Sequence, residues 1–353
     1  MDVLISGLNE EAYLARCLDA LLAQDYPRDL LRVIYIDGGS TDRTIEIARS
    51  RAAKDSRLTV IAGHGMLNLP EALNLGLEVA TGDLVAKIDG HGYPEPDFVR
   101  RAATILAGEA DDVAAVGGRP EQEGETAWGD AVAAARASRF GTGGSVYAGT
   151  SAREYVDTVQ CGVYRRAAVE AVGTFDATMA YGEDDELNWR LRESGYRILL
   201  DTSLRFHYVA RATLPGVYRQ YRNYGRAKVR VAAAHPRYVR PWHLAPAAFV
   251  VAVGATMTAM PFSRRGRRIA HVLAGSYATA AVVAAATSRG AKDTPSRARV
   301  CACFAAMHLG YGTGMLAGLA AAGRRRIHAA AAEDTHKTHP RESAQPPTTS
   351  DGQ

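Results

Sequence analysis

The stretch VIYIDGGSTDRT, residues 33–44, decides the class of fold. It begins with apolar, mostly β-branched and aromatic residues typical of a buried strand. It ends in Asp37, two glycines and two hydroxyl residues that favour a turn and a helix start. The same order returns at residues 83–91, where an apolar strand ends in Asp89. A strand, a turn and a helix that recur along the chain predict an α/β sheet built from βα units.

The pattern extends outward from this stretch in both directions. We expect strands at residues 3–6, 33–36, 58–61 and 83–88, with amphipathic helices between them. Asn9 is expected to cap the first helix, and Ser40 or Thr41 the second. Ligands of open α/β sheets bind beyond the carboxyl ends of the strands, so Asp37 and Asp89 are expected at the mouth of a site.

The second half of the predicted domain is less regular. Residues 121–157 are rich in Gly, Ala and Ser and are expected to form a partly helical loop. A strand at 159–165 and a helix at 181–195 follow, and the helix begins with four consecutive carboxylates. We therefore assign residues 1–235 to one catalytic α/β domain.

Composition limits the classes of function. The chain has 353 residues and a formal net charge of +4, with a pI near 8.8, which is mild compared with the basic surface of a nucleic-acid-binding protein. Its four cysteines lack the pairing of a zinc site, so we expect them to be reduced. The N-terminus enters a strand at once and shows no signal-peptide pattern, so we expect the first domain in the cytoplasm.

The C-terminal part is different in kind. Residues 236–326 are expected to be membrane-associated, and residues 327–353 to form a disordered polar tail. The apolar stretches are residues 244–262, 269–287 and 300–322. Each is close to the length that a membrane-spanning helix needs, although interfacial or re-entrant helices stay open. Arginines crowd both connections, so one consistent solution lays the first stretch along the inner surface and pairs the other two as a hairpin.

Asp37 and the small residues after it form the first candidate site. A carboxylate at a strand end can accept a hydrogen bond from the imide N–H of uracil. Gly39 and Ser40 would let a nucleotide approach the backbone. A turn followed by a helix cap explains the same residues equally well.

Asp89 and His91 form the second candidate site. A carboxylate and an imidazole can hold a divalent cation, Mg²⁺ or Mn²⁺, which neutralises a diphosphate as a glycosidic bond breaks. The alternative is a purely structural role, in which Asp89 caps the turn before Pro94.

The carboxylates of Glu183, Asp184, Asp185 and Glu186 form the third. Crowding raises the proton affinity of a carboxylate and a helix N-terminus lowers it, so such a group can be tuned as a general base. Acidic first turns are also common for electrostatic reasons alone.

Five segments in this order resemble the family 2 glycosyltransferases, and among them the type found in succinoglycan biosynthesis. The segments are residues 8–27, 33–44, 87–99, 156–176 and 181–198. The resemblance covers residues 3–230. It implies a GT-A fold with a mixed sheet flanked by helices, a UDP-sugar donor, a divalent cation and inversion at the anomeric carbon.

Positions that match the family imply individual roles. Asp37 would contact the uracil or ribose, Asp89 and His91 the metal and diphosphate, and Asp184 would be the base. Glu183 and Asp185 would orient the acceptor or the base. The full set assigned to substrate binding is Asn9, Glu10, Asp37, Gly39, Ser40, Asp89 and Arg222.

The sequence departs from the family pattern in three places, one of which is that the usual proline before Asn9 is missing. Only one acidic residue, Asp37, precedes the Gly-Ser segment. The Gln-x-x-Arg-Trp motif of processive synthases is not matched at residues 220–224, which favours addition of one sugar. Arg222 or Arg226 would then either contact a phosphate or be a surface charge near the membrane.

We therefore expect a hexosyltransferase at the cytoplasmic face of the inner membrane. Its partners would be a nucleotide-sugar donor, a lipid-linked or growing polysaccharide acceptor and membrane lipids, with no nucleic acid. One alternative is a Rossmann-type protein or nucleotidyltransferase, but no GxGxxG opens the first helix and no Walker lysine is present. Another is a catalytically degenerate sugar-nucleotide-binding scaffold at the membrane.

Overall fold

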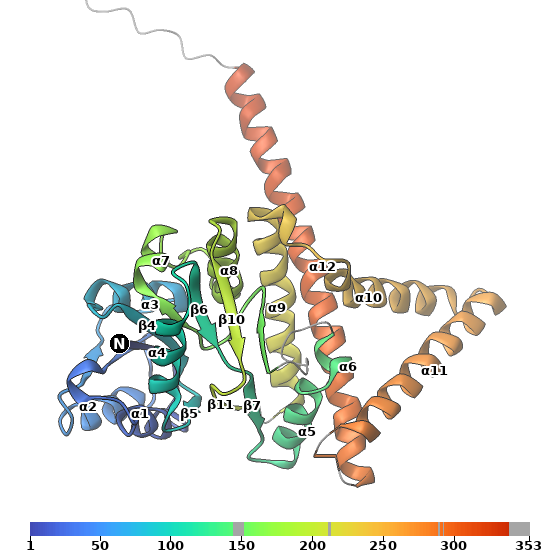
Figure 1. Ribbon diagram of the computed structural model, residues 1–353. Helices are drawn as coiled ribbons and strands as arrows, with labels where there is room; N and C mark the ends of the chain where they lie inside the picture. Colours follow the sequence, from blue (N-terminus) through green and yellow to red (C-terminus); the bar gives the residue numbers. More distant parts are fainter. Residues whose placement is uncertain (144–151, 211–212, 289, 292, 339–353) are drawn as a thin grey trace, which may run out of the picture.

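An eight-stranded mixed sheet organises the N-terminal part of the chain (Figure 1). The computed structural model describes residues 1–143, 152–210, 213–288, 290–291 and 293–338. The sheet has the order β3-β2-β1-β4-β9-β6-β10-β8, and a three-stranded sheet has the order β5-β11-β7. The strands are β1 (Asp2–Gly7), β2 (Arg32–Asp37), β3 (Leu58–Ile61), β4 (Leu84–Asp89), β5 (Gly92–Pro94), β6 (Val113–Gly117), β7 (Pro120–Glu123), β8 (Arg153–Tyr155), β9 (Val163–Arg165), β10 (Arg197–Asp201) and β11 (Phe206–Val209). Strands β3, β2, β1 and β4 are parallel, whereas β9 runs antiparallel to β4 and β6.

Helices cover the sheet and continue beyond it. They are α1 (Leu14–Leu22), α2 (Thr44–Ala52), α3 (Leu69–Val79), α4 (Phe98–Gly108), α5 (Ala127–Arg136), α6 (Arg139–Thr142), α7 (Arg166–Ala171), α8 (Glu183–Glu193), α9 (Leu214–Ala234), α10 (Pro241–Ala259), α11 (Arg264–Thr287) and α12 (Thr294–Thr338), with 3₁₀ turns η1 (Arg28–Leu30) and η3 (Pro236–Tyr238). The GT-A-like mixed sheet and the strands and helices expected near the N-terminus are confirmed.

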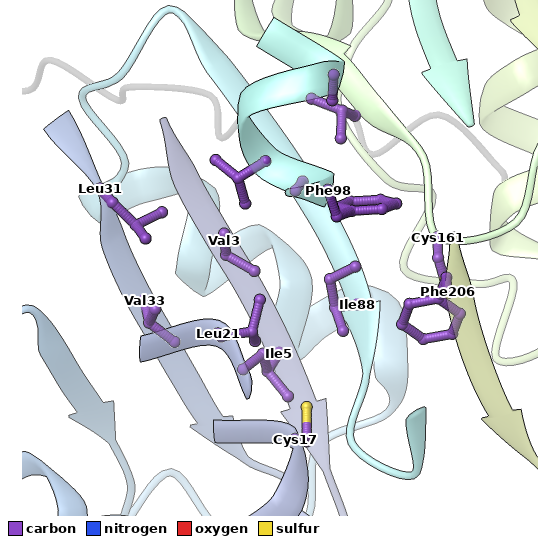
Figure 2. Packing of buried hydrophobic residues seen from close by; sticks show 14 of the residues in the cluster. Val3, Ile5, Cys17, Leu21, Leu31, Val33, Ile88, Phe98, Cys161 and Phe206 are labelled. Atoms are coloured by element: carbon purple, nitrogen blue, oxygen red, sulfur yellow. The ribbon is translucent and has the colours of Figure 1, made fainter. Parts of the chain in front are cut away.

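The alternation of side chains along β1 divides the core into two layers. Val3 and Ile5 face α1 and α4, and Figure 2 shows them near Leu21 of α1 and Phe98 of α4. Leu4 points to the opposite face, where it joins buried side chains of α3, α7 and α8. Both faces of the sheet are thus covered, and the free carboxyl ends of the strands lead into the site.

Two expected helix caps are wrong. Helix α1 begins at Leu14 and follows Tyr13, not Asn9, which has a positive φ of 57°. Helix α2 begins at Thr44, and its first N–H donates to the carboxylate of Asp42 at 3.0 Å rather than to Ser40 or Thr41. Asn9, Ser40 and Thr41 instead form hydrogen bonds that join two loops.

The C-terminal helices form a further layer beside the sheet. The three apolar stretches lie mainly in α10, α11 and α12, each long and apolar enough to cross a membrane, and the first stretch runs three residues past the end of α10. Helix α12 runs alongside α9, while α10 and α11 project away from the domain (Figure 1). Helix α12 continues to Thr338, into the stretch expected to be disordered, because the alanines at 329–332 favour helix. Residues 339–353 of the expected tail lie outside the described residues.

Candidate active site

The carboxyl ends of β1, β2 and β4 meet at one edge of the sheet. Gly7 of β1 is in register with Asp37 of β2, and Ser6 is in register with Asp89 of β4. The two carboxylates that the sequence singled out therefore lie on either side of the end of β1.

Asp37 organises the turn that follows its own strand. One carboxylate oxygen accepts hydrogen bonds from the N–H groups of Gly39 (3.1 Å) and Ser40 (3.0 Å). The other accepts one from the hydroxyl of Tyr35 at 3.4 Å. Gly39 has φ +94°, and a Cβ there would lie 2.9 Å from the carbonyl oxygen of Gly65. The turn thus requires glycine, and the buried carboxylate holds its shape.

Asn9 and Glu10 join the first loop to the second. The side-chain oxygen of Asn9 accepts from the N–H of Thr41 at 2.8 Å, and the N–H of Asn9 donates to the hydroxyl of Ser40 at 3.0 Å. The N–H of Glu10 donates to the hydroxyl of Thr44 at 2.8 Å. These bonds position the two loops against each other at the mouth of the sheet.

Lys87 lies at the centre of a carboxylate cluster that sequence reasoning missed. Its ammonium group is 2.7 Å from Asp184, 2.9 Å from Glu183 and 3.3 Å from Asp89. Only 4% of the lysine side chain is exposed. Burial lowers the pKa of Lys87, but the three carboxylates outweigh burial and raise that pKa above its ordinary value. Three carboxylates around one ammonium leave an excess of negative charge.

Asp184 is the carboxylate in this cluster that suits a general base. One oxygen accepts from Lys87, and the other is buried with no hydrogen-bond partner among the described residues. Burial raises the pKa of Asp184, and with the nearby carboxylates it outweighs Lys87, so that the pKa is about 7. A base with this pKa is about half ionised at neutral pH and still accepts a proton readily.

Asp185, one residue on, faces the other way. Its carboxylate is 2.8 Å from the ammonium group of Lys228 in α9 and 2.7 Å from the hydroxyl of Tyr238 in η3. Burial raises the pKa of Asp185, but these two partners outweigh it and the pKa is lowered. Asp185 is thus a charged group that links α8 to α9, and Glu183 rather than Asp185 shares a partner with Asp184.

His91 lies beside the cluster and has one free nitrogen. Its Nδ1 is 3.1 Å from the carboxylate of Glu10, and its ring packs edge-on against Tyr208 with centroids 4.8 Å apart. Its Nε2 is buried and has no hydrogen-bond partner in the described part of the chain. Burial lowers the pKa of His91, but Tyr208, Glu10 and Asp89 outweigh it and raise that pKa to about 10. A bound cation would have to displace this proton.

These residues fit a divalent cation. A carboxylate behind one imidazole nitrogen is the usual support for a histidine that ligates metal through the other, which is the arrangement of Glu10 and His91. Asp89 supplies a carboxylate ligand beside the imidazole of His91. The excess negative charge of the cluster attracts a cation. Among the described residues, no group of three or more His, Cys, Asp or Glu side chains is arranged as a complete metal site. The substrate would therefore have to contribute ligands.

Arg136 in α5 extends the site toward the C-terminal helices. Its guanidinium lies over the ring of Tyr208, 4.5 Å from the centroid, so that Arg136, Tyr208 and His91 contact in series. The sequence carried no signal for this, because Arg136 lies in an alanine-rich helix. For Lys87 a signal existed: it is a charged residue within the apolar run of β4 that precedes Asp89.

Arg222 is not part of the carboxylate cluster. It lies in α9, and its carbonyl oxygen would be 2.0 Å from a Cβ at Gly314 of α12. The helix backbone at Arg222 thus packs against α12. Of the residues predicted for the site, the structure brings together Glu10, Asp89, His91, Glu183 and Asp184, while Asp37, Gly39, Ser40 and Asn9 shape the neighbouring loops.

A mixed sheet of this order, with an acidic cluster at the carboxyl ends of its strands, defines a GT-A enzyme of the glycosyltransferase class. The family described as Glycosyl transferase family 2 matches residues 2–173. The succinoglycan biosynthesis protein ExoA of Rhizobium meliloti (strain 1021) is 31% identical over 254 residues, which cover 70% of this chain and 76% of ExoA. The chain belongs to the family 2 glycosyltransferases.

Two further proteins are similar. One is the dolichyl N-acetyl-alpha-D-glucosaminyl phosphate 3-beta-D-2,3-diacetamido-2,3-dideoxy-beta-D-glucuronosyltransferase of Methanococcus voltae. It is 27% identical over 233 residues, 65% of this chain and 72% of the relative. The other is the solved structure of the mannosyltransferase PcManGT from Pyrobaculum calidifontis in complex with GDP-Man and Mn²⁺. It has a TM-score of 0.63 at 21% identity and covers 90% of this chain and 86% of that one, which shows the shared fold.

Proposed function

We propose that the chain transfers a hexose from a UDP-sugar, with inversion, to a lipid-linked or growing polysaccharide acceptor at the cytoplasmic face of the inner membrane. The single observation that carries the proposal is the cluster around Lys87. The ammonium group of Lys87 contacts Asp89, the residue that would face the donor diphosphate, and one oxygen of Asp184, whose other oxygen has no partner among the described residues.

In this proposal the chain's own residues divide the work. Asp184 accepts the proton of an acceptor hydroxyl, whose oxygen attacks the anomeric carbon while the bond to the UDP oxygen breaks. Lys87 holds Asp184 and Asp89 at a constant spacing. Asp89 and Nε2 of His91 would hold the divalent cation, which would supply charge neutralisation for the leaving diphosphate. The presence of Mn²⁺ with GDP-Man in the PcManGT structure supports a metal-assisted reaction.

The donor and the acceptor are inferred from separate observations. Asp37 at the end of β2 and the family resemblance favour UDP, and the dolichyl phosphate-linked sugar in the name of the archaeal relative supports a lipid-linked acceptor. Protection against thermal unfolding by UDP-glucose, UDP-galactose, UDP-N-acetylglucosamine or GDP-mannose would identify the donor, because a bound ligand stabilises the folded state.

The test of catalysis is UDP release in the presence of Mn²⁺. We expect Asp184→Asn to abolish release and to leave donor binding intact, and Asp89→Ala to abolish release and to weaken donor binding. Unchanged turnover of Asp184→Asn would refute its role as base. Donor binding by the unmodified chain with no turnover on any acceptor would instead favour the scaffold.

A further inference from the structure

The charge of the chain is divided sharply between its two parts. Residues 1–201 contain 33 acidic and 20 basic residues, whereas residues 202–332 contain 20 basic residues and one acidic residue, Asp293. The modest overall charge therefore conceals a strongly basic C-terminal third. A basic surface beside apolar helices complements a membrane with anionic headgroups.

Helix α9 presents part of this charge as a stripe. Arg219, Arg222, Arg226 and Arg230 are spaced three or four residues apart, which places them on one helix face. Arg219 and Arg230 are exposed, and the other two are partly exposed. In the described part of the chain no ion pair joins any of these four arginines, here called the α9 stripe, to a carboxylate of the protein.

Helix α9 cannot be separated from α12. A Cβ at Gly314 would lie 2.0 Å from the carbonyl oxygen of Arg222, and one at Gly225 would lie 2.1 Å from that of Tyr311. Only glycine permits such close contact between helix backbones. Half of the 18-residue apolar segment of α12 that could cross a membrane is buried within the protein. If α12 crossed a bilayer, it would carry the α9 stripe into the hydrocarbon, where arginine is strongly disfavoured.

Helices α10 and α11 expose apolar side chains almost everywhere. Only 6% of the corresponding apolar segment of α10 and 11% of that of α11 are buried. Phe262, between the two helices, is 88% exposed. Arg264, Arg265, Arg267 and Arg268 start α11 directly after it. A hairpin that crossed the membrane would place these four arginines on the side opposite to the catalytic domain, against the usual distribution of positive charge.

We infer that the chain is monotopic. Helices α10 and α11 lie in one leaflet with their apolar side chains in the acyl region, α12 does not cross, and the α9 stripe binds the phosphates of anionic lipids. Helices α9, α12 and the α10–α11 pair follow one another across the molecule (Figure 1), and α12 contacts α9, α10 and α11. The inference goes beyond the proposed function, because it concerns attachment alone and holds whichever sugar is transferred.

The first experiment tests topology with the full chain made by cell-free translation in the presence of phosphatidylcholine and phosphatidylglycerol vesicles, so that spanning helices can insert as the chain is made. In a Cys301→Ser background, Arg265→Cys marks the α10–α11 connection and Ser194→Cys marks the exposed end of α8 as a control. A membrane-impermeant maleimide should label both cysteines to the same extent on intact vesicles. Labelling of Arg265→Cys only after detergent, with Ser194→Cys labelled before it, would overturn the inference.

The second experiment tests the α9 stripe by vesicle flotation. The triple variant Arg219→Gln, Arg226→Gln, Arg230→Gln should lose about 100-fold of its preference for anionic over zwitterionic vesicles, from a factor of about five per arginine. The control Arg28→Gln, Arg43→Gln, Arg49→Gln removes the same charge from exposed positions of the N-terminal domain and should change the preference less than about threefold. Circular dichroism checks folding, and equal losses in the two variants would refute a specific role of the stripe. Both readouts are independent of turnover.

Discussion

Replacement of Lys87 by methionine tests the carboxylate cluster most directly. Methionine has nearly the length of lysine, so the main change is the loss of the ammonium group that lies 2.7 to 3.3 Å from three carboxylates. Removing one partner of a buried ion pair costs about 3–5 kcal/mol, because the remaining charges stay buried without compensation. At about 2–4 °C per kcal/mol for a domain of this size, Lys87→Met should lower the Tm by roughly 6–20 °C.

The loss should depend on pH with a definite sign. Without Lys87 the carboxylates of Asp89 and Asp184 lose the charge that opposes burial and mutual repulsion, and their folded-state pKa values rise above those of the unfolded chain. The cost of the substitution is therefore largest above these raised pKa values and shrinks as the carboxylates protonate at lower pH. We expect a larger difference in Tm between the variant and the unmodified chain at pH 8 than at pH 5.5.

Differential scanning fluorimetry in the presence of EDTA measures this difference without a compensating cation. Lys54→Met, which removes an exposed lysine beyond α2, is the matched control and should change the Tm by little. A loss of less than about 1 kcal/mol for Lys87→Met would refute the buried cluster. A loss that is equal at both pH values would show that packing rather than charge is responsible.

Three further predictions follow from the same site and its supporting helices. If Asp184, with its pKa of about 7, is the base, kcat/KM should fall tenfold per pH unit well below pH 7, and a flat profile from pH 5.5 to 8 would contradict this. Glu10→Gln should weaken Mn²⁺ binding by about 10- to 100-fold through loss of support for His91, as measured by electron paramagnetic resonance, and unchanged affinity would exclude that support. Gly314→Ala should lower the Tm, because its Cβ would meet a carbonyl oxygen of α9 at 2.0 Å, whereas Gly323→Ala, with nothing within 4 Å, should leave it equal or slightly higher.

The strands of the first half could be predicted because each carries its own signal. Apolar runs that end in Gly or Asp mark β1, β2 and β4, and the register of β1 with its neighbours then brings Asp37 and Asp89 to one edge. The helix caps could not be predicted, because Asn9 and Ser40 bond across two loops that lie far apart in the sequence. A capping residue has the same appearance whether it bonds to its own helix or to another loop.

The acidic residues of the site could be predicted from the sequence, but their pairing with particular lysines could not. Consecutive carboxylates at residues 183–186 suggested one group, yet their partners divide it: Lys87 in β4 binds two of them and Lys228 in α9 binds Asp185. Successive residues of a helix point about 100° apart, so neighbours in sequence face different elements. Which element each one meets is set by where the fold places β4 and α9 around the start of α8, and no local pattern encodes it.

Helix α9 relates the acidic cluster to the proposed membrane surface. Lys228 binds Asp185 of α8, the residue next to Asp184, and it lies on the side of α9 opposite to Arg226 and Arg230 because two residues turn a helix by about 200°. One helix therefore holds the α8 end of the site on one face and the α9 stripe on the other. The base is then separated from the lipid phosphates by about the 10 Å diameter of a helix. In a lipid-linked acceptor with one or a few sugar units, the acceptor hydroxyl would lie at about this distance from the lipid phosphate. The distant end of a long polymer has no such constraint. Within the proposed function, this geometry favours the lipid-linked acceptor over the growing polysaccharide.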